Sequence, residues 1–153
     1  YNATMNKDDA EDYYYFAEDF YESIRKDLSN NARVFFAKYD DKVIGASVIL
    51  NSNGKLNYHL SGSNCKYANL ASGNLLLYQV ALWGYENGYK TLYLGGGVGT
   101  AEDNLLKFKK AFYRGENKHF YVGKKIFCQE KYDELVAMRS DLQETNFFPK
   151  YRG

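Results

Sequence analysis

The sequence predicts an α/β fold in which a mixed, mostly antiparallel sheet carries helices on both faces. Three strand-like runs follow one another across short polar turns, which is typical of an antiparallel meander. A helix that is apolar almost all round comes next, and a short apolar run follows it. A strand, a helix and a strand in that order form a crossover, which places the two strands in parallel. The 153 residues suffice for one domain with its own core, which we expect at residues 1–142.

The first helix and the meander occupy the first part of the chain. Residues 8–29 carry apolar side chains at i, i+3 and i+4 spacing, behind a start rich in the acids that a helix N-terminus favours. Polar turns at residues 40–42 and 52–54 then separate three runs of apolar and aromatic residues. These runs predict strands at Arg33–Tyr39, Val43–Asn51 and Lys55–Ser63.

The second part of the chain alternates helices and strands. Apolar side chains on nearly every side of the segment Ser72–Asn87 indicate a helix packed in the middle of the fold and ended by Gly88. The apolar run Thr91–Leu94 follows as a buried strand, and a tight glycine loop comes after it. The same patterns predict a helix at Asp103–Tyr113, a strand at His119–Cys128, a helix at Gln129–Leu142 and a loose tail at residues 143–153.

Charge, cysteine content and hydropathy exclude several classes of protein. The net charge of +1 gives no global attraction to a polyanion. Acids crowd the first helix and bases crowd residues 107–125, which leaves either two solvated faces or one basic face. Two cysteines and two histidines, each pair far apart, make no metal-ligand set. No apolar run approaches the ~20 residues of a membrane span and no signal peptide is visible, so we expect a cytoplasmic protein.

The predicted third helix contains the clearest anomaly, a lysine among apolar residues. Lys109 falls inside the apolar arc that runs from Phe108 through Leu105 to Leu106 on a helical wheel. Lys107 and Lys110 fall on the polar side. Because burying a bare ammonium group is costly, Lys109 either extends to water or meets a polar or anionic partner. The functional alternative is that Lys109 lines a cleft and stabilises negative charge that develops on a substrate.

Polar residues alternate along the third predicted strand. Regular alternation places His59, Ser61 and Ser63 on one face. A polar face in a central strand needs hydrogen-bond partners or a wet cleft. His59 is therefore either a satisfied structural histidine or a proton acceptor. The opposite face is expected to hold Leu56, Tyr58, Leu60 and Gly62.

A glycine loop lies between the predicted fourth strand and the third helix. A phosphate cradle and a tight turn are the two interpretations of glycines at 95, 96, 97 and 99. The spacing matches neither G-x-G-x-x-G nor the P-loop, which favours the tight turn. Asp103 opens the next helix and is predicted to be its N-cap, with a role facing the substrate as the alternative.

Four segments occur in an order known from one family. They are Tyr58-His59-Leu60-Ser61, Asn74-Leu75-Leu76-Leu77-Tyr78, the run from Gly88-Tyr89 to Leu94-Gly95-Gly96-Gly97, and Leu105 to Phe108-Lys109 and Phe112. Over roughly residues 1–135 this order resembles the GNAT-like domain of Fem-type peptidyl and aminoacyl transferases. The resemblance implies a GNAT fold that lacks its first strand. It also implies transfer of an activated acyl or aminoacyl group to an amine, in bacterial cell-envelope (peptidoglycan) or polysaccharide biosynthesis.

The resemblance also implies roles for single residues. The lysine of the F-K pair lies at the reaction centre of that family and corresponds to Lys109. No tightly bound cofactor is expected. Aminoacyl-tRNA or acetyl-CoA is the expected donor, and a small molecule or cell-wall precursor is the expected acceptor. The residues expected to contact substrate are His59, Ser61, Ser63, Asn74, Asp103, Lys107 and Lys110.

Two departures from the family keep other interpretations open. Complete Fem-type enzymes pair two such domains, so the resemblance implies a longer protein with a second GNAT-like domain upstream. The GNAT pyrophosphate loop, R/Q-x-x-G-x-G/A, should lie at residues 64–74, where this chain has one glycine, Gly73. The alternatives are a CoA-dependent N-acetyltransferase and a GNAT-like binding module without catalysis.

Overall fold

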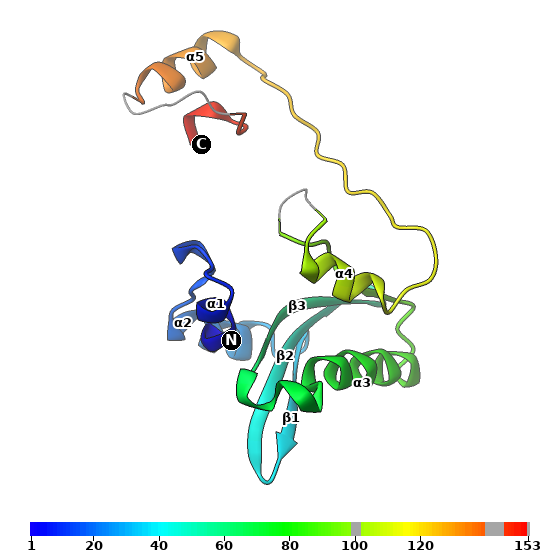
Figure 1. The fold of residues 1–153 in the computed structure, drawn as a ribbon. Coiled ribbons are helices and arrows are strands. Elements are labelled where there is room, and N and C mark those ends of the chain that lie inside the picture. The colour runs from blue at the N-terminus through cyan, green and yellow to red at the C-terminus, as the bar shows by residue number, and fades with distance from the viewer. Residues whose placement is uncertain (99–101, 140–145, 153) are drawn as a thin grey trace. The chain divides into compact units, whose positions relative to one another are not determined.

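The computed structural model describes residues 1–98, 102–139 and 146–152. The chain divides into two compact units, residues 1–114 and residues 115–153. The first unit contains a four-stranded sheet in the order β1-β2-β3-β4, with helices around it (Figure 1). This is the mixed α/β architecture that the sequence predicts.

The sheet consists of the predicted meander and one crossover strand. β1 pairs with β2 and β2 with β3 in antiparallel fashion, whereas β4 pairs with β3 in parallel. Both hairpin turns have two residues at positive φ, Asp40 and Asp41 in the first and Asn53 and Gly54 in the second. Such turns match the twist of the strands that they join. The strands are β1 Ala32–Tyr39, β2 Lys42–Ser52, β3 Lys55–Ser63 and β4 Thr91–Tyr93.

Helix α3, Ser72–Glu86, covers one face of the sheet and forms the crossover from β3 to β4. Val80 packs with Ile49 and Leu56 in the larger core cluster. A Cβ atom at Gly84 would lie 2.6 Å from the Leu56 side chain, so glycine allows the helix to approach β3 closely. The predicted helix at this position is thus confirmed within one residue.

The helix predicted at residues 8–29 is wrong over its first half. The structure has helix α1 at Asn2–Lys7, a 3-10 turn at Asp12–Tyr14 and helix α2 at Glu18–Asp27. Asp8 and Asp12 would lie one turn apart in a continuous helix without a base between them, and like charges at this spacing destabilise a helix. Only the second half of the apolar stripe therefore forms a helix.

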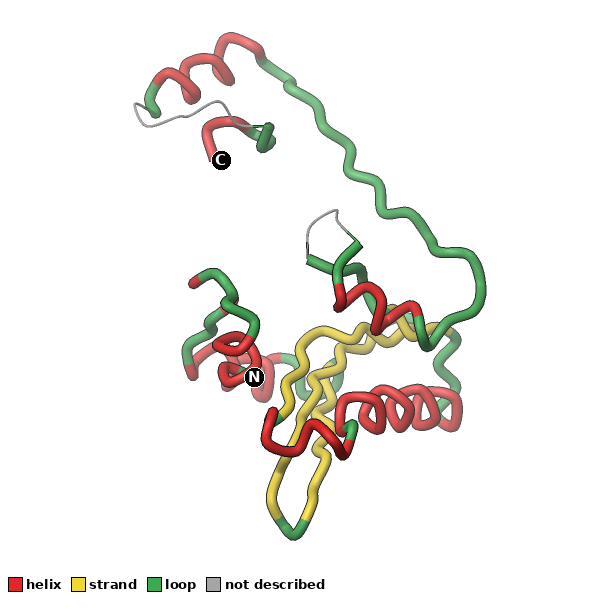
Figure 2. The backbone as a smooth tube through the Cα atoms, in the orientation of Figure 1, coloured by secondary structure: helices red, strands yellow, loops and turns green. Residues whose placement is uncertain are grey.

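The predicted strand at His119–Cys128 is also wrong. Residues 115–127 of the second unit form no helix or strand and run as loop in Figure 2. A strand requires a partner, and in the structure Phe120 and Phe127 are 83% and 89% exposed.

Helix α5, Gln129–Ala137, forms the rest of the second unit together with a 3-10 turn at Lys150–Arg152. The Lys150 N–H donates a hydrogen bond of 2.9 Å to the Tyr132 hydroxyl, which attaches residues 146–152 to α5. Residues 140–142 of the predicted last helix and residues 143–145 of the predicted tail lie outside the described part. Within the described ranges, no helix has the length and apolar character needed to cross a membrane.

Candidate active site

A β-bulge interrupts the central strand β3 at His59. Val48 of β2 pairs with Leu60, and the next residue, Ile49, pairs with Tyr58. His59 is therefore an extra residue without a partner on β2. A bulge leaves backbone groups unpaired and redirects the side chains that follow it, and bulges are common beside active sites.

The bulge overturns the regular alternation predicted for β3. Leu56 and Tyr58 pack with Val80 on the α3 face, so these two residues share a face as predicted. Leu60 and Gly62 instead line a groove on the other face of the sheet. One extra residue reverses the facing of every residue after it, because side chains alternate with a period of two.

The predicted polar face of β3 consequently breaks up into separate contacts. The Ser61 hydroxyl lies 2.9 Å from the hydroxyl of Ser47, which is almost completely buried, and donates to the Ala46 carbonyl at 3.3 Å. The Ser63 N–H donates to the Thr4 hydroxyl at 3.0 Å. These interactions hold strands and α1 together. A serine within the apolar run of β2 was the signal in the sequence for such a buried pair.

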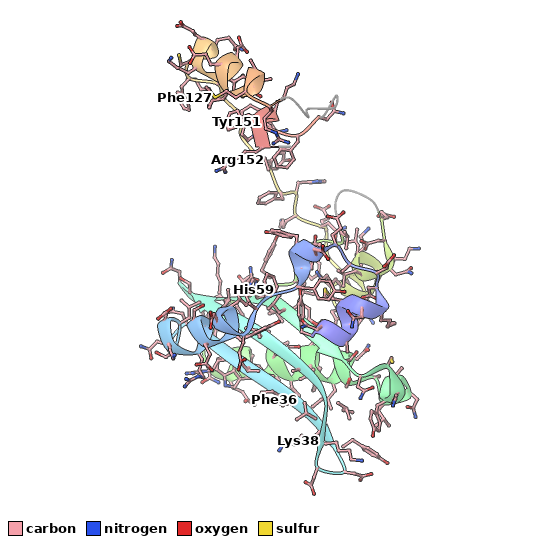
Figure 3. All side chains as sticks on the ribbon, turned by 90° about the vertical axis from the view of Figure 1, so that its left-hand side faces the viewer. Phe36, Lys38, His59, Phe127, Tyr151 and Arg152 are labelled. Atoms are coloured by element: carbon pink, nitrogen blue, oxygen red, sulfur yellow. The ribbon has the colours of Figure 1, made fainter. Side chains whose placement is uncertain are left out.

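His59 remains accessible at the bulge (Figure 3). Partial desolvation by the neighbouring chain lowers the pKa of its imidazole below the usual value. The neutral form, which can accept a proton, therefore predominates at neutral pH.

The partner on the other side of β3 ends before the bulge. β4 pairs with β3 only between Lys55–Asn57 and Thr91–Tyr93. Within the described part of the chain, β3 has no strand partner on this side from Tyr58 onward. The centre of the sheet thus presents a free strand edge, to which an extended ligand can hydrogen-bond.

The loop after β4 is held by Asp103, the N-cap of helix α4, Asn104–Lys110. One Asp103 carboxylate oxygen accepts the Leu106 N–H at 2.7 Å, and the other accepts the Val98 N–H. These backbone hydrogen bonds, above all that from Leu106, lower the pKa of Asp103. A Cβ atom at Gly97 would lie 2.2 Å from this carboxylate, so a larger residue does not fit. The predicted N-cap is confirmed.

Lys109 reaches back from α4 to the same loop. Its ammonium group donates a hydrogen bond of 2.6 Å to the Gly96 carbonyl, and the residue is half-buried. Burial lowers the pKa of Lys109, whereas the Asp103 carboxylate acts in the opposite direction. The structure therefore brings Lys109 and Asp103 together around the glycine loop.

The other predicted site residues lie apart from this pair. Lys110 forms an ion pair with Glu102. Lys107 is exposed on α4, and Asn74 is exposed in the first turn of α3.

The N-terminus of α3 follows β3 through a 3-10 segment at Cys65–Leu70. No side chain caps the first turn of α3, so its leading amide groups are available to a ligand. A Cβ atom at Gly73 would meet no atom within 4 Å, which shows open space beside these amides. Such an N-terminus suits a phosphate or pyrophosphate group, although the glycine-rich loop of the GNAT pattern is missing.

The family model described as acetyltransferase (GNAT) domain matches residues 1–110. The fold is similar to that of an aminoglycoside acetyltransferase from an uncultured soil metagenomic sample, solved in complex with sisomicin. The identity is 15% and the TM-score 0.56, over 79% of this chain and 83% of that one. A ribosomal-protein-alanine N-acetyltransferase from Brucella melitensis biovar Abortus 2308 gives 14% identity and a TM-score of 0.56, over 72% and 82% of the two chains.

No curated protein compared with this chain matches it. Because the two solved structures are only 15% and 14% identical to this chain, their similarity shows the fold alone. The family match covers most of the chain and includes β3, its bulge, the glycine loop and Lys109. The chain therefore belongs to the acetyltransferase (GNAT) domain family, and as a member it is an acyltransferase.

Proposed function

We propose that this chain is an N-acetyltransferase that uses acetyl-CoA to acetylate a primary amine. The observation that carries the proposal is the interrupted centre of the sheet, where β3 bulges at His59 just beyond the last residue paired with β4. The unpaired backbone there suits an extended, amide-containing donor that lies alongside β3. The open N-terminus of α3 suits the phosphates of the same donor.

The proposed reaction is attack of an amine on the carbonyl carbon of a thioester. A C–N bond forms, the C–S bond breaks, the thiol leaves, and the amine loses a proton. Neutral His59 accepts this proton directly or through one water molecule. Lys109 stabilises the negative charge that develops on the carbonyl oxygen, because a half-buried ammonium group acts more strongly there than in water. Asp103 positions the glycine loop, to which Lys109 is hydrogen-bonded.

The first experiment measures thiol release from acetyl-CoA with a panel of primary amines: amino sugars, polyamines and peptides with a free N-terminus. Lys109→Met is expected to lower the rate of transfer by about 10²–10³-fold, the range for loss of one group that stabilises an oxyanion. Lys90→Met is the control, since Lys90 precedes β4 whereas the glycine loop, to which Lys109 is hydrogen-bonded, follows β4. Equal rates for the two variants would remove Lys109 from the mechanism.

Aminoacyl transfer to a cell-wall precursor is a second candidate function. It is favoured by the position of Lys109, which follows Phe108 as the Fem-type resemblance requires and is bonded to the loop after β4. Aminoacyl-tRNA replaces acetyl-CoA in the same assay. Transfer from aminoacyl-tRNA without thiol release from acetyl-CoA would reverse the order of the two candidates. Binding of either donor without turnover by any amine would instead support a binding module.

A further inference from the structure

An apolar groove lies between α2 and the sheet, on the face opposite α3. Its volume is about 520 Å³, which falls within the range of ligand pockets. Figure 3 shows α2 on this side of the strands. Ile24 of α2 and Leu28, which directly follows α2, form one wall, and Val34, Val48 and Leu60 of three successive strands form the other.

The walls of this groove are incompletely covered by the chain itself. Of the α2 residues only Ile24 is buried, and Val34 on the opposite wall is 47% exposed. Protein interiors normally fill a space of this kind with side chains. An apolar occupant would remove the remaining apolar surface from water, which is favourable.

The charge at the rim selects an uncharged occupant. Glu22 and Arg25 line the groove and neutralise each other through hydrogen bonds of 2.7 to 3.2 Å. The other polar residues on the lining are Tyr1, Tyr21, Ser29 and Ser61, whose side chains carry no charge at neutral pH. A cationic amine or a phosphate would find no unpaired side-chain charge of opposite sign on this lining.

The part of β3 that lines the groove begins directly after the bulge, next to the proposed site of acyl transfer. Leu60, Ser61 and Gly62 line the groove and directly follow the bulge at His59. The carbon chain of a thioester placed beside the bulge would therefore lie next to residues that line the groove. We propose that the groove binds the aliphatic chain of an acyl donor longer than acetyl, so that the product is an N-acyl amide.

This inference rests on the proposed function and leaves its chemistry unchanged. The amine nitrogen bonds to the acyl carbon, the C–S bond breaks, and the thiol leaves. His59 accepts the proton that the amine loses. Each methylene that enters the groove should raise kcat/KM about fourfold until the groove is full, the value expected for burial of one CH₂ group.

The test compares acetyl-, butanoyl-, octanoyl- and dodecanoyl-CoA with one amine and the whole chain. Val48→Trp fills the groove and is expected to lower octanoyl transfer at least tenfold while acetyl transfer stays unchanged. Ala46→Leu is a milder filling variant on the same wall, in case the larger side chain disturbs folding. Tyr78→Trp is the control, because Tyr78 is exposed on α3, away from the groove.

Each result decides the proposal. Equal rates for octanoyl- and acetyl-CoA, or equal loss of both in Val48→Trp, would overturn it. A loss confined to amines with long alkyl chains would show that the groove binds the acceptor, which also overturns it. If no donor is turned over, the proposed function fails, and calorimetry then decides the groove separately. Tighter binding of octanoyl-CoA than of acetyl-CoA, removed by Val48→Trp, supports the inference, and equal binding contradicts it.

Discussion

Asp103, the N-cap of α4, and Lys109 within α4 both hydrogen-bond to the backbone of the glycine loop. Asp103 accepts the backbone N–H groups of Val98 and Leu106, and Lys109 donates to the Gly96 carbonyl. Asp103 thus caps the helix and closes the loop with one carboxylate. The steric consequence falls on Gly97, where a Cβ atom would overlap the carboxylate, whereas a Cβ atom at Gly96 would meet nothing within 4 Å.

Gly97→Ala should therefore destabilise the loop, and Gly96→Ala should not. The alanine at position 97 pushes the Asp103 carboxylate away from the Val98 and Leu106 amides, which removes the N-cap. We expect Tm to fall by roughly 2–8 °C for Gly97→Ala and to change little for the matched neighbour. Thermal unfolding followed by circular dichroism measures both. Equal Tm values for the two variants would contradict the tight contact.

At the scale of elements, local signals predicted the meander and the crossover, because they depend on neighbouring residues. Asn53-Gly54 is a turn sequence in isolation, and the apolar run of α3 ends at Asn87-Gly88 in sequence and structure alike. The bulge at His59 has no such local signature. It depends on how two strands pair, so the facing of Leu60 and Ser61, and with it the groove, could not be predicted.

Helix α3 shows the same limit in its burial pattern. Leucines occupy positions 75, 76 and 77, and the sequence alone does not rank them because the helix is apolar almost all round. In the structure Leu77 is 1% exposed and Leu75 is 51% exposed. Leu77→Ala should therefore lower the free energy of unfolding by about 2–5 kcal/mol, and Leu75→Ala by less than about 0.5 kcal/mol. Urea denaturation measures both, and a larger loss for Leu75→Ala would contradict the orientation of α3.

At the scale of the whole chain, the core and the candidate site belong to the first unit. Both buried clusters, the bulge, the glycine loop and Lys109 lie within residues 1–114. The second unit contains the segment 115–127, whose alternating and aromatic sequence predicts a strand but which pairs with no strand among the residues that the structure describes. Strand formation depends on a second segment and cannot be read from the propensity of the first. The expected domain end at residue 142 stays a prediction.

Hydrogen exchange should separate these two parts of the chain. Residues 45–52 and 55–63 pair in the β2–β3 ladder, whereas residues 116–127 have no backbone hydrogen bond within the described structure. Amide exchange requires opening of such bonds. Peptides from 116–127 should therefore exchange fully at the shortest labelling time, those from α5 more slowly, and those from β2 and β3 slowest of all. Protection of 116–127 equal to that of β2 would mean that this segment pairs as a strand in solution, as its sequence predicts, and that its exposed aromatic residues are covered there.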